Sequence, residues 1–166
     1  MNLSLVLSKL GLSQSLTQDV TLLLVVLLLS FIFGISIGRS KLITILANIY
    51  AAFAIFSAIP SGIFKDYTYN VIIFLALIVA LTLLSKKLLE VPFYISGSGF
   101  LWRVFLLSFL EVALVLGIIM KILPKKVALS YISASSLGYL TSPNMFIFWM
   151  VAPLLFVLLI HHRINR

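Results

Sequence analysis

Residues 20–38 form an unbroken stretch of apolar and small residues that contains no charged side chain. An α-helix needs about 20 such residues to cross the hydrocarbon core of a bilayer. The stretch is too long for the apolar part of a cleaved signal peptide, and no small-residue cleavage site follows it. It therefore predicts a helix that spans a membrane.

Further apolar runs of this kind follow, each bounded by basic residues, proline or glycine. The five predicted spans are residues 20–38, 42–59, 69–84, 100–123 and 144–160. The runs are unlike the short alternating segments of a transmembrane β-barrel. Composition agrees, because 63% of the chain is hydrophobic and only 10% is charged, whereas about a quarter of a soluble domain is charged. We expect an all-α, polytopic transmembrane helical bundle.

Three further segments complete the predicted organisation. The apolar residues of segment 1–19 share a helical face, so we expect it to lie along the membrane interface. Segment 127–143, VALSYISASSLGYLTSP, is too rich in hydroxyl groups for a span and predicts a short interfacial or re-entrant helix. If it crossed the membrane, the last span would invert and the termini would lie together. Residues 161–166 form a basic tail.

Basic residues give the chain a net charge of +8 and sit at the ends of the apolar runs. This position is typical of topology determinants and lipid-headgroup contacts. The residues concerned are Arg39, Lys41, Lys86, Lys87, Arg103, Lys125, Lys126 and Arg163. Because they are not interleaved with stacking aromatic residues, we expect membrane lipid and not nucleic acid as the partner. One side of the membrane is expected to carry slightly more basic residues than the other. This bias predicts an external N-terminus and a cytoplasmic C-terminus.

Small residues recur at helical spacing on both sides of the first basic turn. The first set is Ser30, Gly34 and Gly38, and the second is Ala47, Ala51, Ala54 and Ala58. Small faces let helix backbones approach closely where lipid removes the hydrophobic drive for association. We expect the first two spans to pack as a hairpin through these faces. An alanine face left unused by the first span would mediate oligomerisation.

Glu111 is an acidic residue inside a predicted span, eight residues after Arg103 and ten before Lys121. An ionisable side chain at this depth is costly, which makes it a functional candidate. Two hypotheses stay open: a proton- or cation-binding site between helices, or a protonated carboxyl that holds helices together by hydrogen bonding. Asn48, in the second span, is expected to bond to Ser30 or to Glu111.

The sequence contains no constellation typical of catalysis. It has no cysteine, and H-E-x-x-H does not occur. His161 and His162 are adjacent, but without a nearby carboxylate they make a poor metal site. Asp19, Asp66 and Glu90 are assigned to loops. We expect no enzyme, no cofactor and no metal.

The stretch GISIGRSKLITILANIYAAFAIFSAIP (residues 34–60) resembles the first two spans of the colicin V production protein (CvpA) family. The shared features are a span ending in small residues, a basic turn and a second span rich in small residues. The resemblance covers residues 20–123; the turn GRSK lacks the acidic residue often found in the family, and the fifth span has no counterpart there. It implies a small bacterial inner-membrane protein tied to envelope homeostasis or export, with no catalytic residues to carry over.

Two functions follow as alternatives. The first is a structural or scaffolding subunit of an envelope or export assembly, with other membrane proteins or further copies of itself as partners. The second is a small channel or transporter subunit with its site at Glu111, although no inverted repeat is evident. If Glu111 faced Asn48 and the small-residue groove, the first hairpin would form a wall of that site. We expect the hairpin to be scaffold only.

Overall fold

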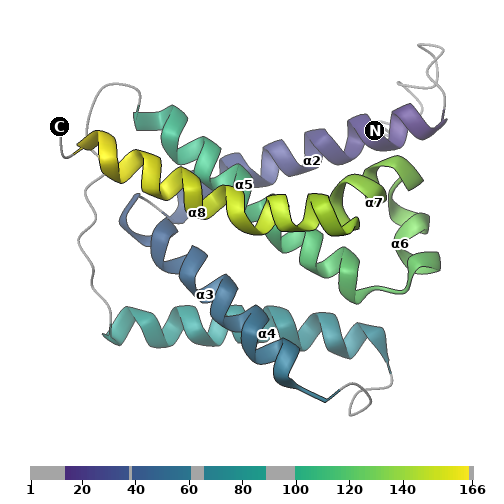
Figure 1. Cartoon of the computed structure of the whole chain (residues 1–166), viewed down its shortest axis with the longest axis horizontal. Helices are drawn as coiled ribbons and strands as arrows, with labels where there is room; N and C mark the ends of the chain where they lie inside the picture. The colour runs from purple at the N-terminus through teal and green to yellow at the C-terminus, as the bar shows by residue number, and fades with distance from the viewer. Residues whose placement is uncertain (1–13, 38, 61–65, 89–99, 165–166) are drawn as a thin grey trace.

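The computed structural model describes residues 14–37, 39–60, 66–88 and 100–164, and this part of the chain consists of helices and short connections without a β-strand (Figure 1). The long helices are α2 (Gln14–Ile37), α3 (Arg39–Ala58), α4 (Tyr67–Leu88), α5 (Phe100–Ile122) and α8 (Pro143–Ile164). Two short helices, α6 (Lys125–Tyr131) and α7 (Ala134–Thr141), separate α5 from α8. The predicted all-α fold class is confirmed.

Each of the five long helices is long and apolar enough to cross a membrane. Large apolar side chains cover their outward faces, as with Leu28 on α2, Val79 on α4 and Leu158 on α8. Lipid is the solvent that suits such a surface, and helices satisfy their own backbone groups within it. The chain is therefore a multi-pass membrane protein. The start of α2 and the end of α8 lie at opposite ends of the bundle (Figure 1), as an odd number of crossings requires.

The helix bounds differ from the predicted ones mainly at the first span. Helix α2 begins at Gln14 and not near residue 20, so Asp19 lies inside a helix and its assignment to a loop is wrong. The helix includes Asp19 because its carboxylate finds partners at the bundle end, as described below. Asp66 does lie outside the helices, directly before α4.

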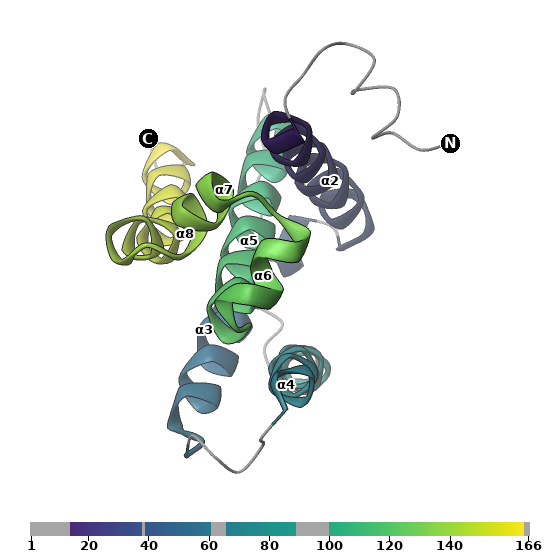
Figure 2. The ribbon, with the colours of Figure 1, turned by 90° about the vertical axis from the view of Figure 1, so that its right-hand side faces the viewer.

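Helix α5 is the centre of the bundle. It packs against α2 on one side and against α7 and α8 on another, while α4 rests mainly on α3 (Figure 2). The buried face of α5 includes Leu107, Leu114 and Ile118, which form one hydrophobic core with α3 residues such as Leu42 and Ile49. The middle of α5 is consequently the part of the chain most enclosed by other helices.

The semi-polar segment before the last span folds as α6 and α7 at one end of the bundle (Figure 1). Its apolar side chains pack on the end of α5, where Ile132 and Leu140 join Met120 in a second core. Ser133 precedes α7, and its hydroxyl accepts a hydrogen bond from the Ser136 backbone amide at 3.1 Å, which is the usual role of serine at a helix start. The prediction of a short helical segment in place of a span is confirmed, although the segment forms two helices and not one; its position relative to the membrane surface stays a prediction.

The predicted packing of the first hairpin is wrong in its partner and in one of its faces. Helix α2 packs mainly on α5 and only slightly on α3. The predicted alanine face is exposed along its whole length, at Ala47, Ala51, Ala54 and Ala58. Helix α3 instead buries the face made by Leu42, Ile45, Leu46, Ile49 and Ala52. Larger side chains form more dispersion contacts than alanine methyl groups, so they take the protein-facing side.

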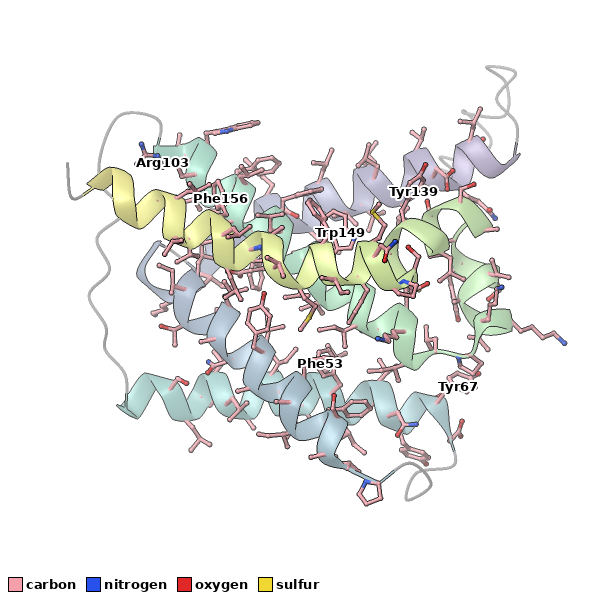
Figure 3. All side chains as sticks on the ribbon, viewed as in Figure 1. Phe53, Tyr67, Arg103, Tyr139, Trp149 and Phe156 are labelled. Carbon is pink, nitrogen blue, oxygen red and sulfur yellow. The ribbon has the colours of Figure 1, made fainter. Side chains whose placement is uncertain are left out.

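The basic residues lie near the ends of the spans. Lys41, Lys125 and Lys126 are exposed, and Arg103 is partly exposed at the end of α5 away from Tyr67 (Figure 3). Gly38 lies outside the described residues, as do the side chains of Arg39, Lys86, Lys87 and Arg163. The orientation of the chain in a membrane stays a prediction.

Candidate functional site

Glu111 lies in the middle of α5 and is completely buried, with 0% of its surface exposed. Neither of its carboxyl oxygens has a hydrogen-bond partner among the described residues. Arg103 therefore does not pair with it. An unpaired carboxylate inside a protein or a bilayer is strongly unfavourable, so the side chain needs either a proton on its own oxygen or a cation beside it.

Ser108, one turn before Glu111, is also a buried polar residue. Its hydroxyl is buried and has no hydrogen-bond partner within the described chain. Residues three apart on a helix are neighbours on its surface, so Ser108 and Glu111 form one polar patch on α5. Three side-chain oxygens of this patch thus have no hydrogen-bond partner in the described part of the chain.

Helix α2 closes one side of this patch through Gly34. A Cβ atom added at Gly34 would lie 2.8 Å from the Ser108 Oγ and 3.4 Å from a methyl carbon of Val104, so only glycine fits here without a shift. Because α2 and α5 run antiparallel (Figure 1), Ser30, one turn before Gly34, faces the level of Glu111. Ser30 is fully buried, and its hydroxyl donates to the Val26 carbonyl at 2.6 Å.

Tyr50 connects helices α3 and α8. Its hydroxyl donates to the backbone carbonyl of Met150 at 2.5 Å. Pro153 is buried inside α8. Since proline has no backbone N–H, it leaves the carbonyl of Trp149, four residues earlier, without its helical donor.

The prediction that Asn48 bonds to Ser30 or Glu111 is wrong. Asn48 is buried and turns to α4, where its Oδ1 accepts from the Ser85 hydroxyl at 2.9 Å and its Nδ2 donates to the Thr82 hydroxyl at 3.4 Å. The physical reason is the rotation of α3: the face that carries Asn48 packs on α4, whose hydroxyl groups satisfy the amide. Asn48 belongs to a helix contact and not to the Glu111 patch.

A second polar contact lies at the bundle end that carries α6 and α7. The Asp19 carboxylate accepts hydrogen bonds from the hydroxyl groups of Ser133 and Ser136, the latter at 2.6 Å. It ties the first turns of α2 to the start of α7. Nearby, the Trp149 indole N–H donates to the Tyr139 carbonyl at 2.9 Å (Figure 3), which holds α7 against α8.

The ammonium group of Lys121, near the end of α5, lies 3.9 Å from the centre of the Phe146 ring. This is a favourable cation–π distance, and it holds α5 against the start of α8. The described residues contain no group of three or more histidine, aspartate or glutamate side chains suited to a metal ion. The side chains of His161 and His162 lie outside the described part.

Fold and site together define the chain as a helical multi-pass membrane protein with a buried acid that has no hydrogen-bond partner among the described residues. In comparisons with family models, curated proteins and solved structures, no match was found. The resemblance to the CvpA family stays a prediction.

Sequence reasoning identified Glu111 but missed Ser108, Tyr50 and the serines that bind Asp19. The spacing of Ser108 three residues before the acid was a usable signal, since it puts both on one face. Tyr50 gave no such signal, because its role depends on which helix α3 meets. The bond from Asp19 to Ser133 joins residues far apart in the sequence and requires knowledge of the fold.

Proposed function

We propose that this chain is a small channel or transporter subunit whose proton- or cation-binding group is Glu111. The observation that carries the proposal is the complete burial of Glu111, with both carboxyl oxygens lacking a hydrogen-bond partner in the described chain. An acid that serves only to join helices would donate or accept a bond across the contact. An acid that binds and releases an ion needs unsatisfied oxygens.

The surroundings of Glu111 support the same function. Ser108 adds another unpaired oxygen, and the buried Pro153 leaves α8 with a carbonyl free of its helical bond. Interrupted helices beside a buried ionisable residue are how membrane transporters build ion sites near the bilayer midplane. Ser108 lies on the same helix as Glu111, and Pro153 lies on α8, which packs on α5.

The test is ion flux through the full chain in proteoliposomes, with an enclosed pH-sensitive dye and a potassium diffusion potential. We expect Glu111→Gln to abolish proton flux, because the amide cannot release a proton. Asp66→Asn is the matched control, since it removes an exposed acid next to α4 and leaves the buried patch intact. Unaltered flux in Glu111→Gln would contradict the proposal, and loss of folding alone would favour a structural role for the acid.

Reaction with dicyclohexylcarbodiimide, an apolar reagent for protonated carboxyl groups, separates a proton from a metal cation as occupant. For a proton site we expect mass spectrometry to find the label on Glu111, with no protection by sodium or potassium. Protection by one of these ions would make that ion the occupant. Absence of label from Glu111 under all conditions would count against an accessible site.

A second candidate is a scaffolding subunit of an envelope or export assembly in a bacterial inner membrane. The exposed alanine face of α3, defined by Ala47, Ala51, Ala54 and Ala58, favours it, because such a face allows close approach of another helix. The resemblance to the CvpA family points to the same role. The chain has no cysteine, so single cysteines along this face can be crosslinked cleanly, with Val79→Cys on α4 as control. A purely monomeric pattern would remove this candidate.

A further inference from the structure

Helix α2 buries one narrow face. Among its described residues the buried ones are Val26, Ser30 and Gly34, which recur every fourth residue. Large apolar side chains on either side of this stripe are exposed, as with Leu27 and Phe31. Ser30 and Gly34 therefore contribute little or no side chain to the contact with α5, the main packing partner of α2 (Figure 2).

The two hydroxyl groups at this contact form no hydrogen bond across it. Ser30 donates to the Val26 carbonyl of its own helix at 2.6 Å. The Ser108 hydroxyl on α5 is buried without a partner in the described chain, and its Oγ would lie 2.8 Å from a Cβ added at Gly34. Small faces and interhelical hydrogen bonds hold helices together in lipid. At Ser30 and Gly34 the described contact has the first without the second.

The Ser108 hydroxyl differs from other hydroxyl groups inside the helices. Thr21, Thr82 and Thr141, like Ser30, donate to the carbonyl four residues earlier, which is a common bond for such residues within a helix. Ser108 forms no such bond. Its hydroxyl is therefore free to bind water or an ion whenever the contact with α2 opens.

A polar attachment holds α2 near its start. The Asp19 carboxylate accepts hydrogen bonds from Ser133 and Ser136 at the start of α7. Gly34 follows Asp19 by fifteen residues, or about 22 Å along the helix. A helix attached in this way can tilt about its start and separate from α5 at Gly34. Movements of whole helices or domains about a fixed point are a common means of opening a site.

We propose that α2 is the movable wall of the Glu111 site, and that the ion reaches Glu111 when α2 tilts away from α5 at Gly34. The inference rests on the proposed function and adds its access route. With α2 in place, Ser108 and Glu111 are completely buried. With α2 withdrawn, the face of α5 that carries Ser108 is open, and Glu111 is its neighbour on the helix surface, because the two are three residues apart. Return of α2 encloses the site again.

A disulfide across the contact gives the first test. A Cβ added at Gly34 would lie 3.5 Å from the Cβ of Ser108, within the range of about 3.5–4.5 Å for a disulfide, and the chain has no cysteine of its own. In proteoliposomes of the full Gly34→Cys/Ser108→Cys chain, we expect oxidation with copper phenanthroline to abolish proton flux and dithiothreitol to restore it. The two single-cysteine variants are the matched controls, and oxidation should not change their flux.

Two results of this test would overturn the access route. One is equal flux in the oxidised and the reduced double variant, with the disulfide confirmed by mass spectrometry. The other is absence of the disulfide after oxidation, which would contradict the close contact of α2 and α5 at Gly34.

Thiol labelling gives a second test, which needs neither flux nor a change at Gly34. In the full chain in liposomes, we expect N-ethylmaleimide to label Ser108→Cys, because α2 exposes this position to water in part of the molecules. Leu114→Cys is the matched control: Leu114 is completely buried on the same helix, but it belongs to the core shared with α3, so it should stay unlabelled. No label on Ser108→Cys, or equal label on both variants, would overturn the inference.

The two tests separate the inference from the function on which it rests. If flux requires Glu111 but is the same with and without the disulfide, the access route is wrong and the proposed function stands. If no variant conducts, yet Ser108→Cys is labelled and Leu114→Cys is not, the proposed function fails and the movement of α2 stands.

Discussion

Two buried polar sites inside the spans differ in whether their side chains form hydrogen bonds. One lies between α3 and α4, and the other lies at the middle of α5. Asn48 uses both ends of its amide, accepting from Ser85 and donating to Thr82. Glu111 and Ser108 use none of their side-chain oxygens within the described chain. Both places are buried and surrounded by apolar side chains. The difference indicates that the α3–α4 contact serves assembly. The oxygens of the Glu111 patch, in contrast, form no hydrogen bond that would join helices in the described chain.

The largest expected effect comes from filling the space beside the patch. Gly34→Leu puts a side chain where a Cβ alone would lie 2.8 Å from the Ser108 Oγ, so α2 must move away from α5. Overpacking of this kind destabilises by about 3 kcal/mol, measurable as the free energy of unfolding in mixed detergent micelles. Gly138→Leu is the control, because nothing lies within 4 Å of a Cβ there. Equal losses in both variants would refute close packing of α2 on α5.

The assembly role of the α3–α4 contact predicts a smaller loss. Asn48→Ala leaves the Ser85 hydroxyl without its acceptor and should lower the free energy of unfolding by about 1–2 kcal/mol. In a double-mutant cycle, Asn48→Ala and Ser85→Ala should couple, whereas Asn48→Ala and Ser108→Ala should add independently. Coupling of Asn48 with Ser108 would join the two contacts and end the distinction between them.

Replacing Glu111 by an apolar residue should raise the free energy of unfolding, whereas replacing Asn48 should lower it. Glu111→Met replaces an unpaired buried acid by an apolar side chain of similar length, which removes no hydrogen bond of the described structure. We expect a gain of about 1 kcal/mol in the free energy of unfolding, together with loss of flux. A destabilised Glu111→Met that keeps its flux would show that the acid is structural after all.

The smallest effect is expected at Asp19, where a satisfied polar contact lies at the bundle end. Asp19→Ala removes the bonds to Ser133 and Ser136, but water can replace them, so the loss should be about 0.5 kcal/mol. Protease accessibility of the α6–α7 segment should rise more clearly than global stability falls. An effect as large as that of Asn48→Ala would place this contact inside the bundle core.

Much of this architecture could be predicted from the sequence. Apolar run length sets the number of spans, and the hydroxyl content of residues 127–143 distinguishes that segment from a span. The pairing of helices could not be predicted, because in lipid an apolar face does not reveal which side is covered by protein. Ala51 illustrates this: its spacing favours a packing face, yet it is exposed, while the neighbouring Ala52 is fully buried.

For the candidate site, the sequence could predict the central residue but not its neighbours. Glu111 could be identified because a lone acid in an apolar run stands out against its neighbours. Its surroundings could not, since Gly34 lies beside Ser108 only through the packing of α2 on α5. Asn48 was assigned to the wrong partner for the same reason: sequence places it in a span but does not give the rotation of α3.

The central position of α5 has a consequence for how the chain is made. Helix α5 is the fourth of the five spans to leave the ribosome, yet it is the principal packing partner of the first, α2. Until α5 is inserted, α3 and α4 can pair, while the glycine and serine face of α2 remains exposed to lipid. We therefore expect assembly of α2 to wait for the insertion of α5, so that a nascent chain arrested before α5 would expose an unassembled first span.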